Sequence, residues 1–219
     1  MARILVLNPN SSVSVTAAVD RGLAPLRFPG GPEIVCDTLA EGPAGIETQA
    51  HIESVVQPIA RRIADDPADA FVLACFSDPG LFLARETVAK PVLGIGESAF
   101  FMAAGMARTF GIISILDRSI PRHLRYVQML GLTDKLAGDR AANTGVAGLA
   151  DGCNALDRLI AVGRALKDQD GAGALVLGCA GMTPYRTEIE TAVGIPVIDP
   201  TQAAVARAIG LIALGYGRI

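Results

Sequence analysis

The chain has 219 residues, of which 51% are hydrophobic and 19% are charged, and 19 basic against 22 acidic residues give a formal net charge of −3. This balance argues against nucleic acid or an anionic membrane as a partner, because no basic excess exists to neutralise phosphates. Aromatic residues make up only 5% of the chain and Trp is absent, which disfavours base-stacking surfaces.

Short apolar runs alternate with longer stretches of helical periodicity, the pattern of a parallel α/β protein. The expected strands, in chain order, are Ile4–Leu7, Glu33–Asp37, Ala70–Cys75, Pro91–Ile95, Phe110–Leu116, Ala174–Cys179 and Ile195–Ile198. The expected helices are His51–Ala64, Ser98–Ala107, Asp151–Lys167 and Thr201–Leu214. Residues 71–74 do not alternate between apolar and polar types, as is typical of strands covered on both faces.

A weak internal repeat divides these elements into two groups. The segment Ala70–Cys75 (AFVLAC) resembles Ala174–Cys179 (ALVLGC), and a Pro-Val strand follows each cysteine after a similar interval. We therefore expect two pseudo-symmetric Rossmann-like halves with mainly parallel sheets and an active site in the cleft between them. Residues 1–98 with 203–219 would form the first half, and residues 99–202 would form the second.

The chain contains four cysteines, at positions 36, 75, 153 and 179. The first apolar run is only four residues long, and no apolar stretch reaches the roughly 18 residues of a membrane span. We therefore expect a cytoplasmic protein with no membrane partner and with reduced thiols. Cys36 and Cys153 are expected to be core residues, since free cysteine is among the most buried residue types.

Cys75 and Cys179 each end a predicted central strand, and ligands of open α/β sheets bind at the carboxyl ends of strands. Each is followed by a short turn and a helix with Pro in its first turn, and the positive end of a helix dipole lowers the pKa of a nearby thiol. Two such thiols on opposite sides of a ligand suit proton abstraction beside a carbonyl. One thiolate removes the proton and the opposing thiol delivers another, which requires no cofactor.

Residues 94–99 (GIGESA) fit G-x-G-x-x-A between a strand and a helix, which is the fingerprint of a dinucleotide site. Glu97 would place a carboxylate where the pyrophosphate should lie, so close strand–helix packing is the better explanation of these glycines. His51 and His123 lack the spacing of metal ligands, so we expect surface histidines and no metal.

Four blocks carry a family resemblance: residues 7–12 (LNPNSS), 42–48 (GPAGIET), 74–81 (ACFSDPGL) and 177–182 (LGCAGM). On these blocks the chain resembles the Asp/Glu/hydantoin racemase superfamily, and more narrowly its hydantoin and allantoin racemase branch. The resemblance implies an isomerase that racemises 5-substituted hydantoins or allantoin without a cofactor. Cys75 and Cys179 would be its acid–base pair, and a homo-oligomer would be its assembly.

The resemblance also implies substrate-binding residues. Asn8, Asn10, Ser77, Asp78 and Gly181 would hold the polar edges and carbonyl oxygens of a small-molecule substrate. Two further candidates are Glu47, in the Gly/Pro-rich second block, and Ser119, after the strand that mirrors the first one.

The chain departs from the family pattern at the first cysteine. Amino-acid racemases of the superfamily follow that cysteine with Asn-Thr, whereas this chain has Phe76-Ser77, which argues against free aspartate or glutamate as substrate. Three alternatives remain: a related cysteine-dependent isomerase or decarboxylase, an amino-acid racemase, and a non-catalytic small-molecule-binding protein.

Overall fold

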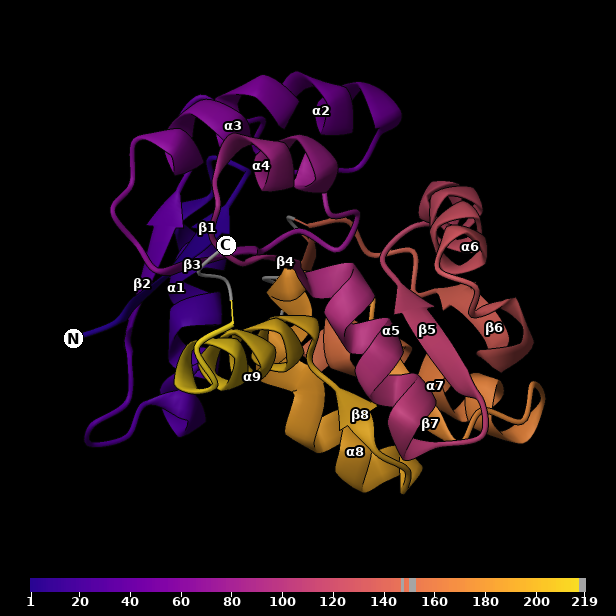
Figure 1. Ribbon diagram of the computed structural model, residues 1–219. Helices are drawn as coiled ribbons and strands as arrows, with labels where there is room; N and C mark the ends of the chain where they lie inside the picture. The colour runs from indigo at the N-terminus through magenta and orange to yellow at the C-terminus, as the bar shows by residue number, and fades with distance from the viewer. Residues whose placement is uncertain (147, 150–152, 217–219) are drawn as a thin grey trace. The chain divides into compact units, whose positions relative to one another are not determined.

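The computed structural model describes residues 1–146, 148–149 and 153–216 (Figure 1). The chain divides into two compact units, of which the first is Met1–Ser98 together with the described residues from Thr201 onward. The second unit is Ala99–Pro200. Each unit contains a four-stranded parallel sheet with helices, so the predicted α/β class is confirmed.

The elements of the first unit, in chain order, are β1 (Arg3–Asn8), α1 (Val13–Gly22), the 3-10 helix η1 (Ala24–Leu26), β2 (Glu33–Thr38), α2 (Gln49–Ser54), α3 (Val56–Ala64), β3 (Ala70–Leu73), α4 (Leu81–Thr87) and β4 (Val92–Gly94). Helices α5 (Ile95–Met106) and α9 (Pro200–Ala213) each begin in one unit and end in the other. The sheet has the order β2-β1-β3-β4.

The elements of the second unit, in chain order, are β5 (Phe110–Ser114), η2 (Asp117–Ser119), α6 (Ile120–Met129), η3 (Thr133–Lys135), β6 (Leu136–Ala141), α7 (Cys153–Asp168), β7 (Ala174–Leu177), η5 (Ala180–Tyr185), α8 (Arg186–Val193) and β8 (Val197–Ile198). The sheet has the order β6-β5-β7-β8. The two sheets therefore have the same topology, and the strand that precedes Cys75 or Cys179 lies next to the first strand of its sheet.

Helices cover both faces of the first sheet. Figure 1 shows α2, α3 and α4 together on one face, where Ile59, Ile63 and Leu81 form a core with the strand residues Leu5 and Phe71. Helices α1 and α9 lie on the other face and are tied together, because the Gln202 amide donates to the carbonyl of Gly22 at 2.7 Å. Burial on both faces explains why β3 and the middle of β1 are wholly apolar.

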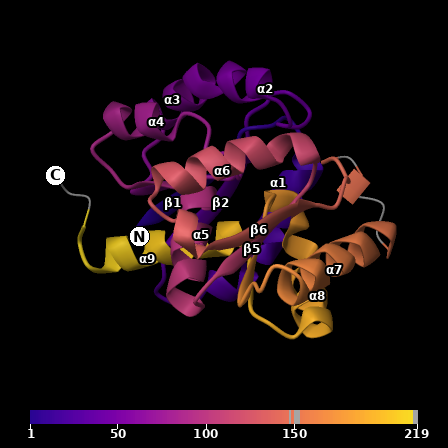
Figure 2. The same cartoon turned by 90° about the vertical axis from the view of Figure 1, so that its right-hand side faces the viewer.

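The second sheet is covered in the same way. Helices α7 and α8 lie side by side (Figure 2), and Leu159 and Ile189 from them pack against Leu175. On the opposite face Phe100 of α5 stacks on Phe110 of β5 with ring centroids 5.7 Å apart. The rings of Phe100 and of Tyr126, from α6, form a T-shaped pair with centroids 6.0 Å apart.

The differences from the expected elements include helix α1 and strand β6, which were not predicted, and one expected helix that is divided. Strand β6 was not predicted, because its sequence LAGDRA contains no apolar run and all six residues are only partly buried. The expected helix His51–Ala64 is two helices that meet at Val55, with Thr48 capping the first through the backbone N–H of His51 at 3.2 Å. Alternation and apolar runs identify buried elements, so a half-exposed edge strand escapes them.

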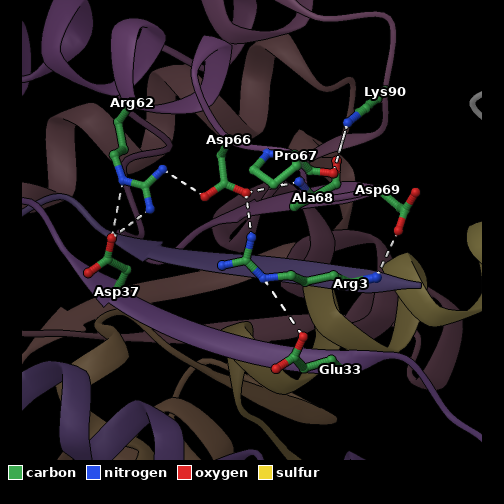
Figure 3. A network of polar contacts seen from close by, with 9 residues as sticks. All are labelled: Arg3, Glu33, Asp37, Arg62, Asp66, Pro67, Ala68, Asp69 and Lys90. Atoms are coloured by element: carbon green, nitrogen blue, oxygen red, sulfur yellow. Dashed lines mark hydrogen bonds and ion pairs between the residues drawn. The ribbon is translucent and has the colours of Figure 1, made fainter. Parts of the chain in front are cut away.

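A network of charged side chains joins the strands of the first unit (Figure 3). Asp66 accepts hydrogen bonds from Arg3 at 2.9 Å and from Arg62 at 2.8 Å, and Arg62 also binds Asp37. Burial by itself raises the pKa of Asp66, but hydrogen bonds from Arg62 and from the Ala68 N–H outweigh it and hold the pKa below its ordinary value of 3.8. The network thus stabilises the ionised carboxylate.

Among the described helices, none combines the length and the apolar character that crossing a membrane would require.

Candidate active site

Cys75 follows β3 at the carboxyl end of the first sheet. The backbone N–H of Ala74 continues the ladder by donating to the carbonyl of Leu7 at 2.8 Å, and Cys75 is the next residue. Its carbonyl accepts the N–H of Asp78 at 2.9 Å, which closes a tight turn before α4. The Cys75 side chain is partly buried and packs against the core of its unit.

Cys179 occupies the matching position in the second sheet. The N–H of Gly178 donates to the carbonyl of Ile113 at 2.9 Å, and the carbonyl of Cys179 accepts the N–H of Met182 at 3.1 Å. Residue 178 must be glycine for this close approach, since a Cβ there would lie 2.6 Å from the Ile113 carbonyl oxygen. The Cys179 side chain is partly buried against the core of the second unit.

The strand register places the two cysteines at the same position relative to their sheets. The last pair of β3 with β1 is Leu73 with Leu7, and the last pair of β7 with β5 is Leu177 with Ile113. Each cysteine lies two residues beyond its pair. The repeat seen in the sequence is therefore a repeat of strand pairing and of the turn that follows, rather than a chance similarity of apolar runs.

A backbone donor contacts the Cys179 sulfur. Sγ accepts a hydrogen bond from the N–H of Gly181 at 3.4 Å, at the start of the 3-10 helix η5. A hydrogen bond to sulfur favours the charged form of a thiol, as the proposed acid–base chemistry needs. Gly181, which the sequence assigns to substrate binding, is in this structure a partner of the thiol.

Cys36 is only partly buried, so it is not the fully buried core residue that was expected, and its surroundings differ from those of the other two cysteines. Burial, and then the neighbouring carboxylate of Asp20, raises the pKa of Cys36 to about 12, so this thiol stays protonated at neutral pH. A protonated thiol is a poor base, which fits the expectation that Cys36 does no chemistry. The side chain of Cys153, the other expected core cysteine, lies outside the described residues.

Asn8 and Asn10 form a closed network at the end of β1. Asn8 Nδ2 lies 3.0 Å from Asn10 Oδ1 and 3.0 Å from Thr16 Oγ1, while Asn8 Oδ1 accepts the backbone N–H of Asn10. Asn10 Oδ1 also accepts the N–H of Ser12 at 2.9 Å, and Asn10 Nδ2 has no acceptor among the described residues. Asn8 therefore holds the loop in place through its hydrogen bonds to Asn10 and Thr16.

Asp78 has a structural role that the sequence did not indicate. Its carboxylate accepts the backbone N–H groups of Gly96 and Glu97, each at 2.9 Å, and so caps α5. Gly94 makes room for it, since a Cβ there would lie 2.2 Å from the carboxylate. The glycines of the dinucleotide fingerprint thus surround a protein carboxylate at the position where a phosphate would bind.

The remaining candidates divide by their contacts. Ser77 is half-buried and its hydroxyl has no partner among the described residues. The buried Ser119 accepts a hydrogen bond from Arg122 at 3.2 Å. The backbone N–H of Glu47 donates to His51 Nδ1 at 3.4 Å, which places Glu47 beside the start of α2.

His123 is not the surface histidine that was expected. It is only 3% exposed, and its Nδ1 lies 2.9 Å from Asp139 and 3.0 Å from Ser114. The Ser114 hydroxyl donates to the same carboxylate. This cluster does not have the geometry of a hydrolase triad, because Ser114 and Asp139 share one ring nitrogen and the serine proton goes to the carboxylate.

This cluster lies at the end of β5, which pairs with the strand before Cys179. Ser114 ends β5, directly after the residue whose carbonyl binds Gly178, and it corresponds by register to Asn8 in β1. Strands β1 and β5, which pair with β3 and β7, therefore each end in a buried polar residue. An isolated histidine with no spacing pattern gave no indication of this. Within the described ranges, no three side chains of His, Cys, Asp or Glu gather as a metal site.

Comparison with known protein families assigns the chain to one of them. The family model described as Asp/Glu/hydantoin racemase matches residues 4–208. The chain belongs to this family. It is an isomerase of the racemase type, and the resemblance found in the sequence is confirmed.

Named relatives agree with the assignment to the family. A hydantoin racemase of Paenarthrobacter aurescens is 38% identical over 220 residues, covering 98% of this chain and 92% of the relative. The solved allantoin racemase from Klebsiella pneumoniae has a TM-score of 0.92 at 32% identity, over 99% of this chain and 89% of that one. An allantoin racemase from Pseudomonas fluorescens has a TM-score of 0.93 at 28% identity, over 98% and 92%.

Proposed function

We propose that this racemase inverts the stereocentre of a 5-substituted hydantoin or of allantoin by proton transfer between Cys75 and Cys179, without a cofactor. The observation that carries the proposal is the equivalent placement of the two thiols, each two residues beyond a matching strand pair at the carboxyl end of its sheet. Relatives named as hydantoin and allantoin racemases support the substrate class.

The proton balance of the step is simple. The thiolate of one cysteine takes the proton from the carbon beside the ring carbonyl, and the electrons of that C–H bond move onto the carbonyl oxygen. The thiol of the other cysteine then protonates the same carbon from the opposite face. One thiol and one thiolate remain, with their roles exchanged, so no external base is consumed.

Neighbouring groups would bind the substrate rather than exchange its proton. Asn10 Nδ2 and the Ser77 hydroxyl are donors without partners among the described residues, and such groups suit the oxygens of a neutral ring. Asn8 would hold Asn10 in place. Four further residues would contact the substrate in addition to making the structural contacts described above. They are Asp78, Gly181, Ser119 and Glu47.

The decisive experiment replaces each thiol separately. Cys75→Ser and Cys179→Ser are expected to lower racemisation at least about a hundredfold, because acid–base groups contribute on that order. Cys36→Ser is the matched control and should retain activity. Chiral chromatography of 5-substituted hydantoins, allantoin, aspartate and glutamate measures the rates and identifies the substrate class.

A second readout tests the proton transfer itself. Racemisation in deuterium oxide should place deuterium at the stereocentre, as mass spectrometry would show. High activity in either single mutant would contradict the two-thiol mechanism, and turnover of aspartate in place of the rings would contradict the substrate assignment.

A further inference from the structure

A groove of about 460 Å³ lies on the first unit. Its walls come from the end of α4, the segment before β4, β4 itself and the last turns of α9. Cys75 follows the carboxyl end of β3, whereas the groove is lined by residues 88–91 at the amino end of β4. The groove therefore belongs to a different part of the sheet from the proposed active site.

Lys90 supplies a fixed positive charge to this groove. Its Nζ donates to the carbonyls of Pro67 at 3.2 Å and Ala68 at 2.5 Å, as Figure 3 shows. An ammonium group has three N–H donors, so one remains. No carboxylate forms an ion pair with Lys90 in the part of the chain that the structure describes. Its charge faces the two carbonyls and the ring of Phe71, whose centroid lies 6.0 Å from Nζ.

Arg85, in the last turn of α4, supplies a second cation to the groove. Its Nε donates to the carbonyl of Val92 at 3.0 Å and its Nη2 to Glu97 at 2.5 Å, which fixes the guanidinium plane. These contacts leave Nη1 without an acceptor among the described residues. The side chain is 37% exposed, whereas Glu97 is 7% exposed. Glu97 also lies 3.7 Å from Nη1 of Arg207, which lines the same groove, so this carboxylate is shared by two of the three cations of the groove. Nη1 of Arg85 remains available to a ligand.

Apart from Arg207, the rest of the lining is apolar. Val88, Pro91, Val92, Leu93 and Leu211 contribute aliphatic surface beside the cations. A small ion such as phosphate or acetate would gain the charge contacts but leave this surface exposed to water. A neutral apolar molecule would cover the surface but leave the donors of Lys90 and Arg85 without a new partner.

We propose that the groove binds a monocarboxylate with an aliphatic tail. Its carboxylate accepts hydrogen bonds from Lys90 Nζ and Arg85 Nη1, and its tail covers the aliphatic wall. Charge-assisted hydrogen bonds of this kind are stronger than neutral ones and give the site its preference for an anion. The proposal does not depend on the chemistry of the two cysteines.

Isothermal titration calorimetry with hexanoate tests the site on the full chain. Hexanoate is expected to bind at least about tenfold more tightly than hexanamide, which lacks the charge, and than acetate, which lacks the tail. Equal binding of hexanoate and hexanamide would overturn the role of the cations. Equal binding of hexanoate and acetate would overturn the role of the apolar wall.

Variants locate the binding. Lys90→Gln should weaken hexanoate binding about three- to tenfold while its amide still donates to the loop carbonyls, and Leu211→Glu should abolish binding by placing a carboxylate in the groove. Arg61→Gln removes an exposed cation from α3, outside the groove, and should leave binding unchanged. Circular dichroism melting of each variant checks that it folds.

Two results would refute the proposal. The first is undiminished binding to folded Lys90→Gln and Leu211→Glu, which would place hexanoate elsewhere. The second is failure of the wild type to bind hexanoate. A change of sedimentation coefficient in Leu211→Glu would then identify a second copy of this chain as the occupant of the groove.

Discussion

The backbone N–H of Gly181 donates a hydrogen bond to the sulfur of Cys179 at 3.4 Å. The turn that begins η5 thus aims a peptide dipole at a thiol that the proposed mechanism requires in both protonation states. In the first unit the corresponding turn is closed by the N–H of Asp78 on the Cys75 carbonyl.

Removal of the Gly181 donor should slow racemisation. Gly181→Pro eliminates the N–H at the second residue of the 3-10 helix, where proline is tolerated, and activity should fall about tenfold because the thiolate loses one hydrogen bond. Gly181→Ala retains the N–H and is the matched control. A chiral assay measures the racemisation rate of both variants, and their melting temperatures show whether they fold. Equal activity of the two variants would show that this donor does not assist the thiol.

Loss of the Asp78 carboxylate should destabilise the start of α5. Asp78→Ala leaves two buried N–H groups without acceptors and should cost about 1–2 kcal/mol of unfolding free energy, measured by urea denaturation. Asp78→Asn should cost less, since an amide oxygen still accepts and asparagine tolerates the positive φ of 44° found there. An unchanged stability of Asp78→Ala would contradict the capping role.

The buried cluster around His123 should behave as one unit. Asp139→Ala leaves the Ser114 hydroxyl and the His123 ring without their shared acceptor, and about 1–3 kcal/mol of unfolding free energy should be lost. A double-mutant cycle with Ser114→Ala should show a coupling above about 0.5 kcal/mol. Strictly additive effects would show that the contacts between these groups contribute little.

Asp66 should make stability depend on acid pH. Its folded-state pKa lies below the ordinary value of 3.8, so its stabilising contribution is complete above that value and is lost as the pH falls through the folded-state pKa. Wild type should therefore be more stable than Asp66→Asn by about 1–3 kcal/mol at pH 7, and the difference should shrink below pH ~4. Chemical denaturation from pH 7 to pH 3 measures this difference.

The matched control for that experiment is the neighbouring Asp65→Asn, whose side chain is exposed and which has no ion pair among the described residues. Its stability relative to wild type should change little over the same range. A gap between wild type and Asp66→Asn that stayed constant with pH would mean that the network does not favour the ionised carboxylate.

Local patterns predicted the buried part of the fold. Strands β1, β3, β5 and β7 are short apolar runs covered on both faces, and such runs are visible in any one-dimensional reading of the chain. Strand β6 was missed because an edge strand with partly buried residues carries no such run. The break at Val55 was missed because both helices there share one apolar periodicity.

The candidate site was predictable to a similar degree. The sequence by itself determined the family and the two equivalent cysteines, because each follows a central strand and a recognisable motif within a few residues. Only the tertiary structure decided the partners of Asp78 and His123. Asp78 caps a helix that begins 17 residues later, and His123 meets Asp139 of the unpredicted strand β6. Hydrogen bonds between distant segments depend on how strands pair and helices pack, and no local pattern encodes that pairing.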